Sequence, residues 1–525
     1  MQTRQRVELA SVSALTVVDY VLLYLVQRRL FVHGLGASSP FVWPRTNVDP
    51  QLVQGTLSAY LLLVGISCLL YSWMLVRVSR WRGAVMTAVF IAVPAVLHLF
   101  ALSARPTLSM DAYSYLAHGY LAAHPPLNPY VQEASVVAVY PYGDTLRQLG
   151  WLPLHPQSPY GPLWTQLERF TVLMTGPDAD MGQWLIRVPV LASTWGSALL
   201  IFALASRFVP HLRWTATVGW LWSPISLVEL AGDGHIDAVM VFFVLLTFYA
   251  VVRGWGYLTI VALGLAVAVK YLPAVFAPPL VWTLWTQADS KRKLLTRIAS
   301  GGLTVLTLLT LAFAPFWVGW QTFAGVRESG RLFSSWTPSG LLLTAVGANV
   351  ADPQSEWITQ ALLLSVLGFV VLFVSMRVAG SCQLLRGGAV IACASFAILP
   401  GGWPWYAVLP IALVLCVPTL SAQVLVVVMT VSTRSIAAFG DLQTLGLVPY
   451  ENTLDLDGLI GVTIPGLCCT ILAAALWWRE PQSIEAPTDA EVIAPVAARS
   501  TGIAQRYPMC TEHSGDDTGL PPLGP

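Results

Sequence analysis

A few ionisable side chains at the edges of long apolar runs have the residue types and positions needed for chemistry. Asp111 stands in the segment Met-Asp-Ala-Tyr-Ser-Tyr, directly after an apolar run that begins near Ala84. A carboxylate at a membrane surface can accept a proton from a hydroxyl group, and partial burial raises its pKa toward a useful range. The alternative is that Asp111 is only a helix N-terminal acid, favoured by the helix dipole.

A second candidate is the segment Gly-Asp-Gly-His-Ile-Asp-Ala at residues 232–238, between two apolar runs. Ionisable residues at the end of a membrane span are functional candidates. His235 and Asp237 could bind a sugar phosphate or a metal ion, but zinc would need a third ligand, and the sequence offers none at a readable spacing. The alternative is a helix-capping turn that uses glycine and aspartate.

Three basic residues could hold an anion. Lys270 lies in an apolar stretch before Pro273, where a charge costs about 2.5–3.5 kcal/mol on insertion scales. We expect it to pair with a phosphate or a buried acid, or to extend its ammonium group to an interface. Arg327 and Arg331 lie on a later polar loop, where guanidinium groups could bind phosphate in a bidentate manner or face lipid headgroups.

Aromatic residues cluster beside these groups and could form the wall of a sugar site, because apolar sugar faces stack on aromatic rings. The candidates for substrate binding are Tyr113, Tyr115, Tyr160, Trp403, Trp405 and Tyr406, together with Asp237. The alternative is an aromatic belt at the membrane interface.

The composition identifies the elements that must position these residues. Only 10% of the 525 residues are charged and 56% are hydrophobic, with a net charge of +1. A soluble domain has about 25% charged residues, and a nucleic-acid binder carries a basic surplus, so both classes are excluded. Apolar runs near 20 residues predict an all-α, multi-pass membrane protein with about 13–14 transmembrane helices and short helices in its outer loops.

The chain divides into four segments. Residues 1–104 are expected to hold N-terminal spans, and residues 105–184 an outer catalytic loop with amphipathic helices. Residues 185–478 are expected to form a transmembrane core with an outer loop at 316–355, and residues 479–525 a disordered cytoplasmic tail. Basic loops such as 77–82 and 291–297 indicate the cytoplasmic side, although Arg28, Arg29 and Arg45 would then lie outside.

The order of short motifs resembles the GT-C membrane glycosyltransferases, and most closely the actinobacterial polyprenol-phosphate-mannose-dependent α-(1→6)-mannosyltransferases. The resemblance rests on these motifs: Asp111-x-Tyr-Ser-Tyr, Asn128-Pro-Tyr, Ser158-Pro-Tyr-Gly-Pro, Gly234-His-x-Asp, Lys270 before Pro273, and Pro404-Trp-Tyr. One departure is Ile236, where the family often has Asn.

The resemblance implies an inverting transfer of a hexose, with mannose favoured, from a polyprenyl-phosphate sugar to a glycan or glycolipid acceptor in lipoglycan assembly. It implies a GT-C fold, reaction on the outer face of the cell membrane, an α-(1→6) product and no cofactor or metal. Asp111 would act as general base. The leaving phosphate would face Lys270, Arg327, Arg331 and His235.

Three alternatives stay open at this stage. A polytopic lipid or sugar transporter, or flippase, would often show inverted repeats and charges at the midplane. Here no repeat is visible and the acids cluster on external loops, which favours an enzyme. A GT-C enzyme with another lipid-linked sugar donor, or a non-catalytic relative, would share the same motifs.

Overall fold

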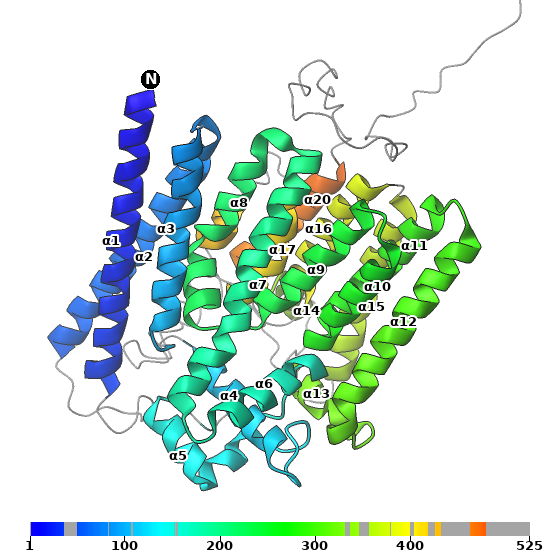
Figure 1. Ribbon diagram of the computed structural model, residues 1–525, viewed down its shortest axis with the longest axis horizontal. Helices are drawn as coiled ribbons and strands as arrows, with labels where there is room; N and C mark the ends of the chain where they lie inside the picture. Colours follow the sequence, from blue (N-terminus) through cyan, green and yellow to red (C-terminus); the bar gives the residue numbers. More distant parts are fainter. Residues whose placement is uncertain are drawn as a thin grey trace, which may run out of the picture.

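The computed structural model shows a bundle of helices (Figure 1), and the expected all-α membrane fold is confirmed. The structure describes residues 2–35, 50–81, 83–106, 109–151, 153, 156–330, 337–345, 356–378, 380–399, 404–417, 426–431 and 463–478. Within these ranges there is no β-strand. The predicted tail at 479–525 lies outside the described residues.

The helices fall into three groups along the chain. The N-terminal group contains α1 (Gln2–Leu35), α2 (Pro50–Arg77), η1 (Val78–Arg80) and α3 (Ala84–Ser103). A group of short helices follows, with α4 (Asp111–Ala123), η2 (Ala134–Val139), α5 (Pro141–Gln148) and α6 (Pro162–Thr175).

The third group forms most of the bundle. Its first half contains α7 (Ala179–Phe208), η3 (Pro210–Leu212), α8 (Arg213–Leu221), the π-helix η4 (Ser226–Gly232), α9 (Asp237–Val252), α10 (Gly256–Val269), η5 (Leu272–Phe276) and α11 (Ala277–Gln287). Its second half contains α12 (Lys291–Phe313), η6 (Ala314–Phe316), η7 (Gln321–Phe323), α13 (Ala324–Gly330), α14 (Pro338–Ala345), α15 (Glu356–Arg377), α16 (Ser381–Ile398), η8 (Pro404–Ala407), α17 (Val408–Cys416) and α20 (Ile464–Trp478).

Fewer helices are long enough to cross a membrane than the 13–14 spans expected. In the described ranges, seven helices are sufficiently long and apolar, or eight if the bent pair η4 and α9 counts as one span. Three more apolar helices have only 10–17 residues. The sequence count is higher because several apolar runs fold as short or broken helices, which hydropathy alone cannot distinguish from full spans.

The short helices α4, α5 and α6 form a layer at one end of the bundle (Figure 1). The N-terminal end of α1 and the α11–α12 connection lie at the opposite end in the same view. The layer has its own apolar core, which includes Leu116, Leu121, Leu146 and Trp151. It is therefore a packed platform rather than a loose loop.

Local sequence explains where the helices of the layer begin. Pro141 and Pro162 occupy the first turns of α5 and α6, where proline is preorganised and its missing N–H costs nothing. Asp178 caps the next helix, α7, by accepting a hydrogen bond from the Met181 backbone N–H at 2.9 Å. These signals fix the first residues of the helices in and next to the layer.

The chain bends by 107° between η4 and α9. Gly234 forms this bend with φ +81°, a backbone conformation that glycine adopts without steric cost. A Cβ atom at this position would collide with the Arg187 side chain. The fully buried Arg187 of α7 donates to the backbone carbonyls of Gly232 at 2.7 Å and Ala104 at 2.7 Å. It therefore fastens the bend to the end of α3.

A second break follows α10, where Lys270 adopts an extended backbone conformation. Pro273 lies in the following turn and cannot extend α10, because it lacks an N–H. The Gly161 N–H donates to the Val269 carbonyl at 2.9 Å, and a Cβ on Gly161 would collide with the Ala268 backbone. The Ser-Pro-Tyr-Gly-Pro segment is thus pressed against the end of α10, beside Lys270.

Candidate active site

Asp111 meets His235 across 124 positions of sequence. The Asp111 Oδ2 atom lies 3.1 Å from His235 Nδ1. Asp111 is the first residue of α4 and its side chain is 19% exposed, whereas the imidazole is fully buried. The carboxylate is therefore partly exposed and is oriented by the buried histidine.

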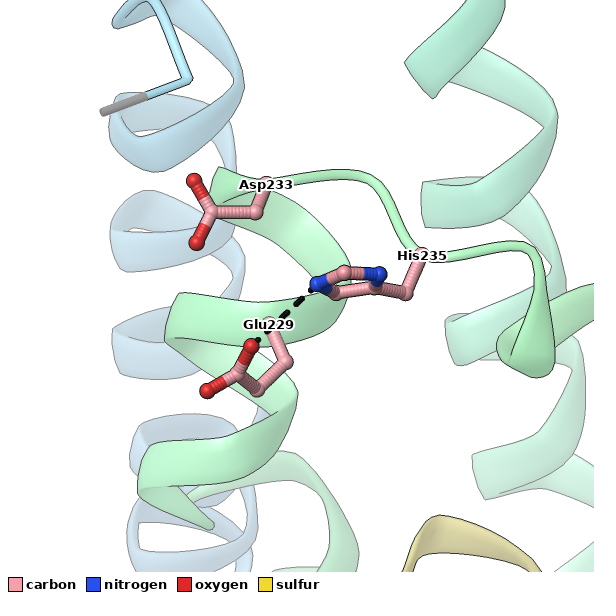
Figure 2. A group of neighbouring side chains, drawn as sticks. All are labelled: Glu229, Asp233 and His235. Atoms are coloured by element: carbon pink, nitrogen blue, oxygen red, sulfur yellow. Dashed lines mark ion pairs between the residues drawn. The ribbon is translucent and has the colours of Figure 1, made fainter. Parts of the chain in front are cut away.

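Two further side chains contact the His235 ring, one at its face and one at its Nε2 atom. The Trp405 ring stacks on it with centroids 3.8 Å apart and planes 14° from parallel. Its Nε2 atom lies 3.3 Å from Glu229 Oε2, as Figure 2 shows. Glu229 comes from the π-helix η4 and is buried. The imidazole therefore connects Asp111 to a second, hidden carboxylate.

Lys270 and Asp237 form a neighbouring ion pair, with Lys270 Nζ 2.8 Å from Asp237 Oδ1. Asp237 is the first residue of α9 and its side chain is 2% exposed, whereas that of Lys270 is 21% exposed. The ammonium group also lies 4.2 Å from the centroid of the Tyr406 ring. The Tyr406 ring contacts Trp405 edge-on, with centroids 6.0 Å apart, and Trp405 stacks on His235, so the two pairs belong to one connected group of side chains.

Two tyrosines lie between these pairs. The Tyr115 hydroxyl is 3.5 Å from Asp111 Oδ2, and the edge of its ring contacts Tyr160 with centroids 5.3 Å apart. Burial, followed by the negative charge of Asp111, raises the pKa of Tyr160 well above its usual value. Burial, with Tyr160 and Asp111 beside it, raises the pKa of Tyr115 in the same direction. Both phenols therefore remain neutral donors at physiological pH.

The other candidates from the sequence lie elsewhere. Tyr113 is buried in the core of the layer, with its hydroxyl 3.3 Å from the Pro106 carbonyl, and it is not brought to Asp111. Arg327 is exposed on α13. That helix packs against the segment with Ser158, because a Cβ on Gly325 would collide with its backbone. Arg331 and Trp403 lie outside the described residues.

Sequence reasoning missed Glu229, Asp233 and Arg187. Each is a charged residue in or beside an apolar run and is almost completely buried in the structure. An ionisable residue in such a position is a functional candidate by default, so the signal was present at Glu229 and Arg187. The sequence did not show that Glu229 and Asp233 would lie on the side of His235 away from Asp111.

Glu229, Asp233 and His235 form a group that could hold a metal ion. One possible ligand atom from each residue lies within 4.8 Å of the others, and all three side chains are buried. The group shares only His235 with the pair considered from the sequence, and its two carboxylates come from other residues. Asp237 itself is engaged with Lys270 rather than with this group.

With this geometry established, the chain can be compared with known proteins. Residues 31–287 match the family described as alpha-(1->6)-mannopyranosyltransferase, N-terminal domain. This range contains Asp111, His235, Asp237 and Lys270. The chain is also 25% identical over 417 residues to alpha-(1->6)-mannopyranosyltransferase A of Mycobacterium tuberculosis, which covers 75% of this chain and 76% of that protein.

The apolar helices define a multi-pass membrane protein, and the two matches support glycosyltransferase activity. Within that class, the two matches support the α-(1→6)-mannopyranosyltransferase family for this chain. The resemblance predicted from the short motifs is therefore confirmed.

Proposed function

We propose that the protein transfers a mannosyl residue from a polyprenyl-phosphate donor to a glycan or glycolipid acceptor and forms an α-(1→6) linkage. One observation carries the proposal. Asp111 and Lys270 come from distant parts of the chain, yet both lie within the segment that matches the mannosyltransferase family. They are connected by successive contacts through His235, Trp405 and Tyr406. The first is a possible base, and the second is a cation suited to a phosphate.

Asp111 serves as the general base in this proposal. Its carboxylate removes the proton from the acceptor hydroxyl while the hydroxyl oxygen forms a bond to the anomeric carbon. The bond between that carbon and the phosphate oxygen breaks, and its electron pair leaves with polyprenyl phosphate. Attack opposite the leaving group inverts the anomeric centre. His235, 3.1 Å from Asp111, orients the carboxylate.

Lys270 stabilises the negative charge that develops on the leaving phosphate. Asp237 holds the ammonium group from its buried side, which leaves the other N–H donors directed away from Asp237. His235 adds positive charge nearby when it is protonated. Arg327 and Arg331 stay candidates for the outer part of the phosphate site.

The aromatic residues around the two pairs bind the sugars. Tyr115 and Tyr160 offer neutral hydroxyl groups and ring faces beside Asp111. Trp405 and Tyr406 cover His235 and Lys270, and Trp403 precedes them in the chain. Tyr113 contributes indirectly in this arrangement, because it packs inside the layer that carries α4.

The reaction is proposed to occur on the outer face of the cell membrane. The layer that carries Asp111 lies at the opposite end of the bundle from the α11–α12 connection (Figure 1). Basic residues begin α12, including Lys291, Arg292 and Lys293, and such residues are enriched on the cytoplasmic side. This arrangement supports an outward-facing site.

The test is to incubate membranes that contain the protein with labelled polyprenyl-phosphate-mannose and an oligomannoside acceptor. We expect labelled product whose new bond is cleaved by an α-(1→6)-specific mannosidase. Asp144→Asn is a matched control, because Asp144 lies on α5 of the same layer and its side chain is 62% exposed. Transfer from another lipid-linked sugar but not from the mannose donor would overturn the assignment of the sugar.

A further inference from the structure

We propose that Glu229, Asp233 and His235 form a binding site for a divalent transition-metal ion, Zn²⁺ or Mn²⁺, directly behind Asp111. Figure 2 shows Glu229 on η4, Asp233 directly after the end of η4, and the imidazole of His235 on the following segment. The possible ligand atoms lie within 4.8 Å of one another. The proposal concerns binding and is independent of the proposed sugar transfer.

The local backbone brings these ligands together. Glu229 and Asp233 are four residues apart at the end of the π-helix η4, and single-turn π-helices occur frequently at functional sites. Gly234 then reverses the chain with its positive φ. Arg187 fixes this turn through the Gly232 carbonyl. The three ligands therefore have a rigid backbone frame that does not depend on a mobile loop.

The orientation of the imidazole is the second observation that points to a metal ion. Histidine ligands almost always donate their other ring N–H to a carboxylate or carbonyl group. Here Nδ1 faces the Asp111 carboxylate at 3.1 Å, and Nε2 points toward Glu229, whose Oε2 lies 3.3 Å away. A bound ion would take the place of the proton that otherwise lies between this buried nitrogen and the Glu229 carboxylate.

The distances are compatible with an ion after small side-chain rotations. Zinc binds histidine nitrogen and carboxylate oxygen at about 2.0–2.2 Å in a tetrahedral arrangement, which places neighbouring donors about 3.4 Å apart. One imidazole and two carboxylates suit Zn²⁺ or Mn²⁺ better than Ca²⁺ or Mg²⁺, which prefer oxygen ligands alone.

A small cavity lies next to the cluster. It has a volume of about 50 Å³, and its lining includes Asp233, Gly232, Arg105 and Tyr24. Three protein ligands leave at least one coordination position for water, and one of the three, Asp233, lines this cavity. The ion would therefore be buried but close to a solvent-sized space.

Metal binding can be measured without any sugar substrate. The purified full-length protein in detergent is treated with a chelator, dialysed against Zn²⁺ or Mn²⁺ and analysed for metal by mass spectrometry. We expect about one ion per chain, a higher melting temperature with the ion, and ligand-field absorption after substitution with Co²⁺. Asp233→Asn and Glu229→Gln should each weaken binding by at least about 10-fold, since changes even in outer-shell partners cost about 10–100-fold.

Glu168→Gln is the matched control. Glu168 is a fully buried carboxyl group on α6 outside the cluster, so its loss should leave metal binding unchanged. Failure of the wild-type chain to retain more metal than Asp233→Asn would overturn the site and would mean that His235 simply bridges Asp111 and Glu229. Equal loss of metal in Glu168→Gln would also overturn it. Because binding is read without the mannose donor, neither result would bear on the proposed transfer.

Discussion

Replacing Lys270 with methionine separates its structural role from its proposed role at the phosphate. Methionine keeps much of the side-chain volume but removes the charge next to Asp237, whose carboxylate is 2% exposed. Removing one partner of a buried ion pair costs about 3–5 kcal/mol, because the other charge stays buried without compensation. We therefore expect Lys270→Met to lower the melting temperature clearly, whether or not Lys270 binds the donor.

The double variant Lys270→Met/Asp237→Asn resolves the ambiguity. It removes both charges of the pair, so most of the lost stability should return. A hydrogen bond to a charged group contributes about 1.5–3 kcal/mol, which corresponds to about 10- to 150-fold in kcat/KM for the donor. If Lys270 contacts the leaving phosphate, this kinetic loss should persist in the double variant.

The assay combines thermal melting in detergent with initial rates measured over a range of polyprenyl-phosphate-mannose concentrations. Lys293→Met provides the control, because Lys293 lies exposed in the first turn of α12 and should change neither quantity. Recovery of both stability and donor kinetics in the double variant would refute the phosphate role. Lys270 would then only neutralise Asp237.

Three further predictions concern the base, the bend and a buried acid. Asp111→Asn should reduce transfer by about 10²–10⁴-fold, the usual contribution of a general base, while donor binding persists in a filter-binding assay; near-normal turnover would exclude Asp111 as the base. Gly234→Ala should destabilise the fold by about 1–3 kcal/mol, because of its positive φ and the collision with Arg187. In melting experiments Gly302→Ala should be neutral or stabilising, since no heavy atom lies within 4 Å of a Cβ there; equal effects of the two changes would contradict the strain argument. Burial raises the pKa of Glu168 well above its usual value, so the folded state keeps its proton where the unfolded chain releases it above about pH 4.3. Stability contributed by this group should fall as pH rises, and Glu168→Gln should remove that slope; identical pH profiles of melting temperature would show that Glu168 is ionised in the fold.

The sequence by itself determined the class of the protein and several of the residues at the site. Low charge and long apolar runs require helices in a membrane, because backbone groups in lipid must be satisfied within the segment. Asp111 and His235 could be found because ionisable residues beside apolar runs are costly unless they are used. Their motifs also predicted the family, which the comparisons support.

The tertiary structure decided how these residues are partnered. His235 and Asp237 are neighbours in one motif, yet His235 turns to Asp111, 124 positions away, and Asp237 to Lys270, 33 positions away. Because the chain bends by 107° between η4 and α9, the side chains of His235 and Asp237 point toward different partners. The bend also brings Glu229 to the other side of the imidazole. Such pairings depend on how helices pack and where they break, and a short motif carries no information about the angle between the helices that flank it.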